Sequence, residues 1–212
     1  MSQGSLFAEP ALMLGEGAWL LPGFALAEAG DLLAGIRQVI AAAPLRHMET
    51  PGGFRMSVAI SSCGQAGWVT DRQGYRYARR DPYSGQPWPD MPSLFMALAS
   101  RAAEAAGYAG FQPDACLINR YEPGARMSLH QDRNERDFSQ PIVSVSLGLP
   151  ATFLFGGLQR GDKTCRLPLH HGDVVVWGGP TRLAFHGIAP LAAGEHVLCG
   201  PCRFNLTFRK AL

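Results

Sequence analysis

The sequence predicts a mainly β protein with flanking helices, an α+β fold whose C-terminal half is a β-sandwich or barrel. Gly (25) and Pro (16) are frequent among the 212 residues, which favours turns and short strands over a helical bundle. Two helical patterns lie in the N-terminal half. From residue 114 onward, short apolar or alternating runs are separated by turn residues. Several short strands at such spacing are typical of a sandwich or barrel.

The two helices are expected at about 27–43 and 93–106, and they should pack on one face of the β structure. In the first, apolar residues recur at helical spacing: Leu32, Leu33, Ile36 and Ile40. The second begins with Ser93 as its N-cap and stops at Gly107.

The strands are expected in the C-terminal half. They are Ala115–Tyr121, Ile142–Leu149, Thr152–Phe155, Asp173–Trp177 and Arg203–Arg209. The Gly-rich, aromatic region 50–89 is interpreted as partly strand and partly a long functional loop.

Length and composition favour one domain over residues 1–212. Hydrophobic residues make up 47% and charged residues 17%, so the chain can bury a sizeable core and is neither disordered nor fibrous. A net charge of +2 permits polyanion binding without requiring it. No Lys or Arg precedes Arg37, and the apolar stretch 18–27 is too short to cross a bilayer. We therefore expect a cytoplasmic monomer, and five cysteines argue against a disulfide framework.

One short motif points to a metal. In an extended segment His130 and Asp132 face the same side, and His186 on a distant strand would complete a 2-His-1-carboxylate triad. Such triads are typical of non-haem Fe(II) oxygenases, although H-x-D alone is a weak signal. A competing pair, His171 and Asp173, precedes a buried run, where its Asp is expected to fasten a turn.

The last strand alternates between apolar and polar residues. One face carries Phe204, Leu206 and Phe208, and the other carries Arg203, Asn205, Thr207 and Arg209. The polar face is either a solvated outer surface or an inward face whose two guanidinium groups require anionic partners. With a candidate iron triad nearby, the second interpretation suits a dicarboxylate co-substrate. Asn119 and Tyr121 share one face of the strand that leads to the triad and could add hydrogen bonds to it.

Several ordered motifs together carry a family resemblance that extends from about Leu26 to Arg209. They are Asn119–Gly124, His130–Asp132, Pro141–Pro150, Phe155–Leu158, Gly172–Gly179 and Arg203–Arg209. In this order they resemble the AlkB family of 2-oxoglutarate- and Fe(II)-dependent nucleic-acid repair dioxygenases.

The resemblance implies a double-stranded β-helix, or jelly roll, over about 114–210, which holds Fe(II) through His130, Asp132 and His186. The residues implied to bind 2-oxoglutarate are Asn119, Tyr121, Arg203, Asn205 and Arg209. In the family, O2 and 2-oxoglutarate are converted to succinate and CO2 while an N-methyl group of a damaged base is hydroxylated and lost as formaldehyde. The implied substrates are 1-methyladenine and 3-methylcytosine in single- or double-stranded DNA, with RNA left open.

The family also implies a nucleotide-recognition lid, which falls at about 45–90. Four Arg (72, 76, 79 and 80) are interleaved there with two Tyr. Arg and Tyr can hold phosphates, and Trp68 offers a face on which an extruded base can stack. The substrate residues expected here are Trp68, Tyr75, Arg76 and Tyr77. The alternative is a solvated loop with ordinary aromatic anchors; by resemblance, Arg160 also lines the substrate side.

Asn134 is a departure from the family. The bacterial protein of this family carries a second Asp two residues beyond the metal Asp, and that carboxylate is implied to contact the damaged base. Asn is nearly isosteric but uncharged. The departure predicts retained activity, with a changed ratio between cationic and neutral lesions.

The pair Cys199 and Cys202 has thioredoxin-type spacing, but that chemistry needs a helix after the motif, and here a strand is expected. With His196 the pair could supply three zinc ligands, without a convincing fourth nearby. We interpret the motif as a tight turn with incidental cysteines.

Two other functions stay open on the sequence. One is a different 2-oxoglutarate oxygenase, acting on a protein or small molecule through another lid. The other is a non-catalytic jelly-roll binding module whose His and Asp are structural. The aromatic and basic lid favours a nucleic-acid enzyme over an oxygenase that acts on a protein or small molecule. The triad and the two Arg of the last strand argue against a non-catalytic binding module.

Overall fold

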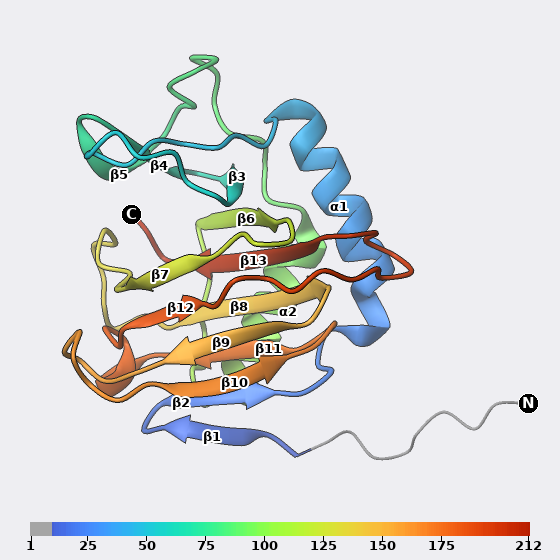
Figure 1. The fold of residues 1–212 in the computed structure, drawn as a ribbon, viewed down its shortest axis with the longest axis vertical. Helices are drawn as coiled ribbons and strands as arrows, with labels where there is room; N and C mark the ends of the chain where they lie inside the picture. Colours follow the sequence, from blue (N-terminus) through green and yellow to red (C-terminus); the bar gives the residue numbers. More distant parts are fainter. Residues whose placement is uncertain (1–9) are drawn as a thin grey trace, which may run out of the picture.

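Two antiparallel sheets form the body of the protein in a computed structural model that describes residues 10–212 (Figure 1). The large sheet has seven strands, in the spatial order β1 (Leu12–Gly15), β2 (Ala18–Leu21), β11 (Val174–Trp177), β8 (Ile142–Gly148), β13 (Arg203–Arg209), β6 (Ala115–Tyr121) and β3 (Ala59–Gly64). The small sheet has four, in the order β10 (Cys165–Leu169), β9 (Ala151–Phe155), β12 (His186–Ile188) and β7 (Met127–His130). Together the sheets make the predicted jelly roll.

Both helices cover the outer face of the large sheet. Helix α1 (Ala29–Ala42) follows a short 3-10 turn, η1 (Leu26–Glu28), and α2 (Ser93–Ala105) packs against β8 and β11. Phe95 of α2 meets Phe208 of β13 edge to face, with ring centroids 6.1 Å apart. This confirms the predicted packing of the helices on one face.

The predicted N-cap of the second helix is wrong. Ser93 is the first helical residue, Pro92 takes the cap position, and no side chain caps the N-terminus. Proline before the first turn is compatible with a helix start, because its missing N–H would have no helical partner there. Gly107 ends the helix as expected, with the positive φ of +91° that glycine adopts without strain.

A second core lies between the two sheets. Ile142 and Trp177 of the large sheet are buried against Phe153 and Phe155 of the small sheet. The aromatic rings of Phe153 and Trp177 lie 6.1 Å apart. This core surrounds the cavity described below and fixes the two sheets that line it.

The strands expected at 115–121 and 203–209 are confirmed in full, and those at β8, β9 and β11 to within one residue. Three strands were not expected, namely β1, β2 and β10. The first two have only four residues each, and β10 is an edge strand with Pro168 and mostly exposed side chains. None of them shows a clear apolar alternation, so local sequence carries little signal.

The region expected to be partly strand contains β3 and a separate hairpin of β4 (Gly67–Asp71) and β5 (Gly74–Ala78). We call this β4–β5 pair the lid hairpin; it lies at the top of the molecule beyond β3 (Figure 1). No helix within residues 10–212 is long and apolar enough to cross a membrane.

Candidate active site

Three predicted metal ligands meet at one end of the small sheet. His130 is the last residue of β7 and His186 the first of β12, and strand pairing places the two directly opposite each other. Their ring centroids are 4.4 Å apart, and Asp132 follows two residues after His130. One possible ligand atom from each of the three lies within 4.8 Å of the others. We call this group the triad.

The protonation states of the triad suit a divalent cation. Burial alone would raise the pKa of Asp132, but Arg209 and the two imidazoles outweigh it and hold that pKa well below its usual value. Burial and the neighbouring His130 lower the pKa of His186 to about 4. A carboxylate and a neutral imidazole are the forms in which these groups bind metals. Two His and one carboxylate are also the donor set preferred by non-haem Fe(II), so the residues present fit the ion.

A buried ion network holds the carboxylate of the triad. Arg209 donates from Nε (2.9 Å) and Nη2 (2.5 Å) to Oδ2 of Asp132. Arg182 donates from Nη1 to the backbone carbonyl of Asp132 (2.8 Å) and from Nη2 to Glu135 (3.2 Å). Oε1 of Glu135 lies 3.4 Å from Nε of Arg209. Two buried anions therefore face two buried cations, as charges removed from water require.

Sequence reasoning missed Glu135 and Arg182. Both are buried, with 6% and 3% of their surface exposed, which is rare for charged residues unless they are paired. Their positions in the sequence could have indicated a role at the site, because each lies within four residues of a triad member. Their partnership with each other required the fold.

The polar face of β13 turns into the protein. All four of its polar residues are at most 6% exposed and line the same cavity: Arg203, Asn205, Thr207 and Arg209. Leu206 and Phe208 on the opposite face join the core beneath the helices. The inward interpretation is therefore confirmed, and a solvated outer face is excluded.

Arg203 is a buried cation whose hydrogen bonding is incomplete. It is 1% exposed, donates from Nη2 to Oγ of Ser146 (2.9 Å), and lies with Cζ 5.0 Å from the centre of the Tyr121 ring. Its Nε and Nη1 have no hydrogen-bond partner among residues 10–212. A buried guanidinium with unused donors calls for an anion, and a carboxylate of 2-oxoglutarate matches its planar fork.

Asn119 and Asn205, the two amide residues predicted to bind 2-oxoglutarate, have different hydrogen-bond partners. Asn205 donates from Nδ2 to Oγ of Ser144 (2.8 Å) and to the carbonyl of Val145 (3.0 Å). Its Oδ1 accepts from Nδ2 of Asn119 (3.1 Å) and from the hydroxyl of Thr207 (2.9 Å). The amide of Asn205 is thus used within the protein and orients Asn119, which is freer to contact a ligand in the cavity.

The cavity has a volume of about 1030 Å³ and extends from Arg203 and the triad to the lid hairpin. Four predicted substrate residues line it: Trp68, Tyr75, Asn134 and Arg160. Trp68 and Tyr75 stack with centroids 5.6 Å apart and an interplanar angle of 19°. Trp68 donates from Nε1 to Oδ1 of Asn134 (3.1 Å), so Asn134 positions the aromatic pair.

The structure does not bring Arg76 and Tyr77 to this cavity. Arg76 donates to both carboxylate oxygens of Asp71, at 2.9 and 2.7 Å, and is held within the lid hairpin. Tyr77 points toward the ion network, where its hydroxyl donates to Oε1 of Glu135 (2.7 Å). Alternation along β5 places Tyr75 and Tyr77 on the same side, but the inner part of that side is occupied by Glu135. Tyr77 therefore connects the lid hairpin to the network around the triad.

In the competing pair, His171 and Asp173, the Asp has the structural role that was expected. Oδ1 of Asp173 accepts from the backbone N–H of Gly23 (2.8 Å), and Oδ2 accepts from that of His170 (2.7 Å). Asp173 thus fastens the β10–β11 turn. His171 instead lies beside the Cys199 region, which sequence reasoning did not foresee.

The C-x-x-C motif forms a turn that leads into β13, as expected. The Cys202 thiol donates to the carbonyl of Cys199 (3.0 Å). Burial and the neighbouring Cys202 raise the pKa of Cys199 to about 11. The motif is followed by β13 and not by a helix whose N-terminus would lower the pKa of the thiol, which argues against the thioredoxin-type interpretation.

Comparison with known proteins gives a consistent result. The family model described as the 2OG-Fe(II) oxygenase superfamily matches residues 17–209. The Alpha-ketoglutarate-dependent dioxygenase AlkB of Escherichia coli (strain K12) is 59% identical over 198 residues, which cover 93% of this chain and 92% of that protein. An AlkB homolog of Caulobacter vibrioides is 46% identical over 188 residues, 88% of this chain and 81% of that one. The solved structure of OsALKBH1 superposes with a TM-score of 0.83 at 27% identity, and covers 95% of this chain and 100% of that one.

Proposed function

This chain belongs to the 2OG-Fe(II) oxygenase superfamily and, within it, to the AlkB dioxygenases, and on that premise we propose that it demethylates N-alkylated nucleic-acid bases oxidatively. The expected substrates are 1-methyladenine and 3-methylcytosine in single- or double-stranded DNA, and the choice between DNA and RNA is left open. Fe(II) is the metal, and 2-oxoglutarate and O2 are the co-substrates.

One observation carries the proposal. A single cavity has the triad and the unsatisfied Arg203 in its interior and the stacked pair Trp68 and Tyr75 on the lid hairpin. Asp132 and His186 of the triad are buried within this cavity, where a base inside a duplex cannot reach them, so the base must be extruded or supplied single-stranded. Stacked aromatic side chains are suited to hold such a base, because every base has a π-face.

The triad and Arg203 would have different roles in this reaction. His130, Asp132 and His186 would hold Fe(II), and Arg203 would pair with a carboxylate of 2-oxoglutarate. When bound, the iron would activate O2, the oxidant: one oxygen atom enters succinate as 2-oxoglutarate loses CO2, and the other enters a C–H bond of the N-methyl group. The N-hydroxymethyl product then loses formaldehyde and a proton, which restores the unmethylated ring nitrogen, N1 of adenine or N3 of cytosine.

The surrounding side chains fix the site for this chemistry. Arg209 and Arg182 hold the segment of Asp132 in place, so the carboxylate does not have to be ordered when metal binds. Trp68 and Tyr75 would orient the base and exclude water on that side. Arg160 lines the same cavity and donates to the carbonyl of Leu129 (2.7 Å), next to His130.

The test is formaldehyde release from an oligonucleotide that carries a single 1-methyladenine or 3-methylcytosine, with 2-oxoglutarate consumption measured in parallel. The wild type should release formaldehyde, and Asp132→Ala should not. Asp137→Ala is the matched control, because Asp137 is an exposed carboxylate in the same segment that bonds Ser139. Consumption of 2-oxoglutarate coupled to a peptide or small molecule, without formaldehyde from either oligonucleotide, would refute the proposal.

A further inference from the structure

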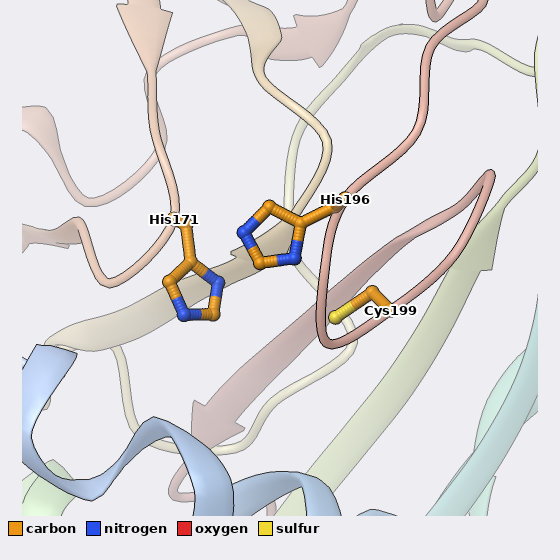
Figure 2. A group of neighbouring side chains, drawn as sticks. All are labelled: His171, His196 and Cys199. Atoms are coloured by element: carbon orange, nitrogen blue, oxygen red, sulfur yellow. The ribbon is translucent and has the colours of Figure 1, made fainter.

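A second cluster of metal-binding side chains lies away from the triad. It consists of His171, His196 and Cys199, and we call it the rear cluster. His171 lies in the turn between β10 and β11, and the other two lie in the connection between β12 and β13 (Figure 2). In Figure 1 that connection extends to the right, whereas the segment that follows β7 and carries Asp132 lies on the left. The two clusters thus occupy opposite ends of the jelly roll.

The geometry of the rear cluster is compact. The two imidazole rings have centroids 4.3 Å apart, and one possible ligand atom from each of the three residues lies within 4.8 Å of the others. Figure 2 shows the Cys199 sulfur pointing toward the two rings rather than away from them. All three side chains are half-buried, so an ion from solvent can reach them.

Gly148 provides the space that the thiol occupies. A Cβ at this position would lie 2.5 Å from the carbonyl oxygen of Cys202 and 2.9 Å from Cβ of Cys199, closer than real Cβ atoms approach, and 3.1 Å from Sγ of Cys199. The backbone φ of Gly148 is +98°, which a side chain rarely adopts. Glycine at the end of β8 therefore allows Cys199 to sit beside His171.

A backbone N–H group points at Nδ1 of each imidazole in the rear cluster. The N–H of Gly148 donates to Nδ1 of His171 (2.9 Å), and the N–H of Leu198 donates to Nδ1 of His196 at a longer 3.3 Å. Burial, together with the neighbouring His196, lowers the pKa of His171, so this ring is neutral.

We propose that the rear cluster is a Zn²⁺ site, with His171, His196 and Cys199 as three ligands and a fourth position open to water or another small ligand. One sulfur and two nitrogen donors suit the borderline-soft Zn²⁺, whereas the nitrogen and oxygen donors of the triad suit Fe(II). The ion would join the β10–β11 turn to the β12–β13 connection. Cys202 is not a ligand, because its thiol is buried and bonds the Cys199 carbonyl.

Co²⁺ provides a probe that distinguishes the two clusters. A thiolate bound to Co²⁺ gives a charge-transfer absorption, and the triad contains no sulfur, so this absorption reports on the rear cluster alone. The metal-stripped full chain is titrated with Co²⁺ under anaerobic conditions, with reductant present to keep the thiols reduced. Because the triad also takes up Co²⁺, we expect the absorption to saturate by about two ions added per chain, and we expect Zn²⁺ to abolish it by displacement.

Matched variants locate the ligands. Cys199→Ser should remove the absorption, and His171→Ala and His196→Ala should each weaken Zn²⁺ binding by at least about 100-fold. Cys165→Ser and His170→Ala change an exposed cysteine and an exposed histidine nearby and should bind as the wild type does. Retained 2-oxoglutarate turnover in Cys199→Ser shows that this variant is folded. The absence of a thiolate absorption in the wild type, or its persistence in Cys199→Ser, would overturn the proposal.

Discussion

The triad and the rear cluster each bring two imidazoles together, with ring centroids 4.4 and 4.3 Å apart, yet their surroundings differ. The third member of the triad is a carboxylate held by two buried arginines, and the group opens on a cavity of about 1030 Å³. The third member of the rear cluster is a thiol that stays protonated until a metal displaces its proton. The comparison teaches that a pair of His residues does not by itself define a site. The third ligand selects the metal, and the surrounding charges and space decide whether chemistry follows.

We expect the largest loss of activity when a ligand of the triad is removed. Asp132→Ala removes the only carboxylate ligand and leaves Arg209 and Arg182 with one buried anion fewer. We expect kcat/KM for formaldehyde release to fall by at least about 1000-fold, beyond the 10–100-fold typical of losing an outer partner of a metal ligand. Cys199→Ser changes the rear cluster and should leave the rate within about twofold. Equal losses in the two variants would show that the clusters are not functionally separate.

The next effect concerns the co-substrate. Arg203→Lys keeps the charge but loses the planar fork, and one charge-assisted hydrogen bond contributes about 1.5–3 kcal/mol. The KM for 2-oxoglutarate should therefore rise by roughly 10- to 150-fold. Arg166→Lys, on the exposed edge strand β10, is the control and should leave this KM unchanged. An unaltered KM in Arg203→Lys would contradict the assignment of Arg203.

A smaller effect separates the lid from the core reaction. Trp68→Ala removes one half of the stacked pair, and base stacking contributes about 1–3 kcal/mol, so kcat/KM for the oligonucleotide should fall by roughly 5- to 150-fold. Uncoupled turnover of 2-oxoglutarate without nucleic acid should continue. Tyr83→Ala, at an exposed aromatic outside the stacked pair, is the comparison. Parallel loss of both activities in Trp68→Ala would mean that Trp68 is needed for the core.

The smallest effect is one of selectivity. In Asn134→Asp the side chain keeps the oxygen that accepts the Trp68 N–H, so the aromatic pair should stay in place. Alkylation at adenine N1 or cytosine N3 makes the base cationic, and the new carboxylate should favour such bases by a few-fold over neutral lesions. The measurement is kcat/KM on both lesion types in both proteins. An identical ratio would remove Asn134 from the account of selectivity.

The two clusters also show what the sequence could predict. His130 and Asp132 are two residues apart and the strand 203–209 alternates strictly, so local patterns named these residues as candidates. The alternation alone left a solvated outer face open, and the ordered motifs of the family resemblance were needed to favour a metal site with an inward polar face. The rear cluster joins His171 to residues 25 and 28 positions away, and only the packing of two connections brings them together. The sequence-based zinc set included Cys202 in place of His171 because it considered neighbours along the chain.

The lid shows the same limit. Trp68 and Tyr75 reach the cavity as predicted, whereas Tyr77 turns to Glu135 and Arg76 to Asp71. Residue type indicated a nucleic-acid surface in this region, but the choice among neighbouring aromatic and basic side chains depends on their partners across the fold. Glu135 and Arg182 illustrate this most clearly, since each is a buried charge whose counter-charge lies on another segment.

The most direct test of the central claim is anaerobic binding of Fe(II) and 2-oxoglutarate, followed through the visible absorption of their complex. We expect this absorption in the wild type, in His171→Ala and in Cys199→Ser, and its loss in Asp132→Ala and His186→Ala. Loss of the absorption in His171→Ala together with its persistence in Asp132→Ala would contradict the assignment of iron to the triad.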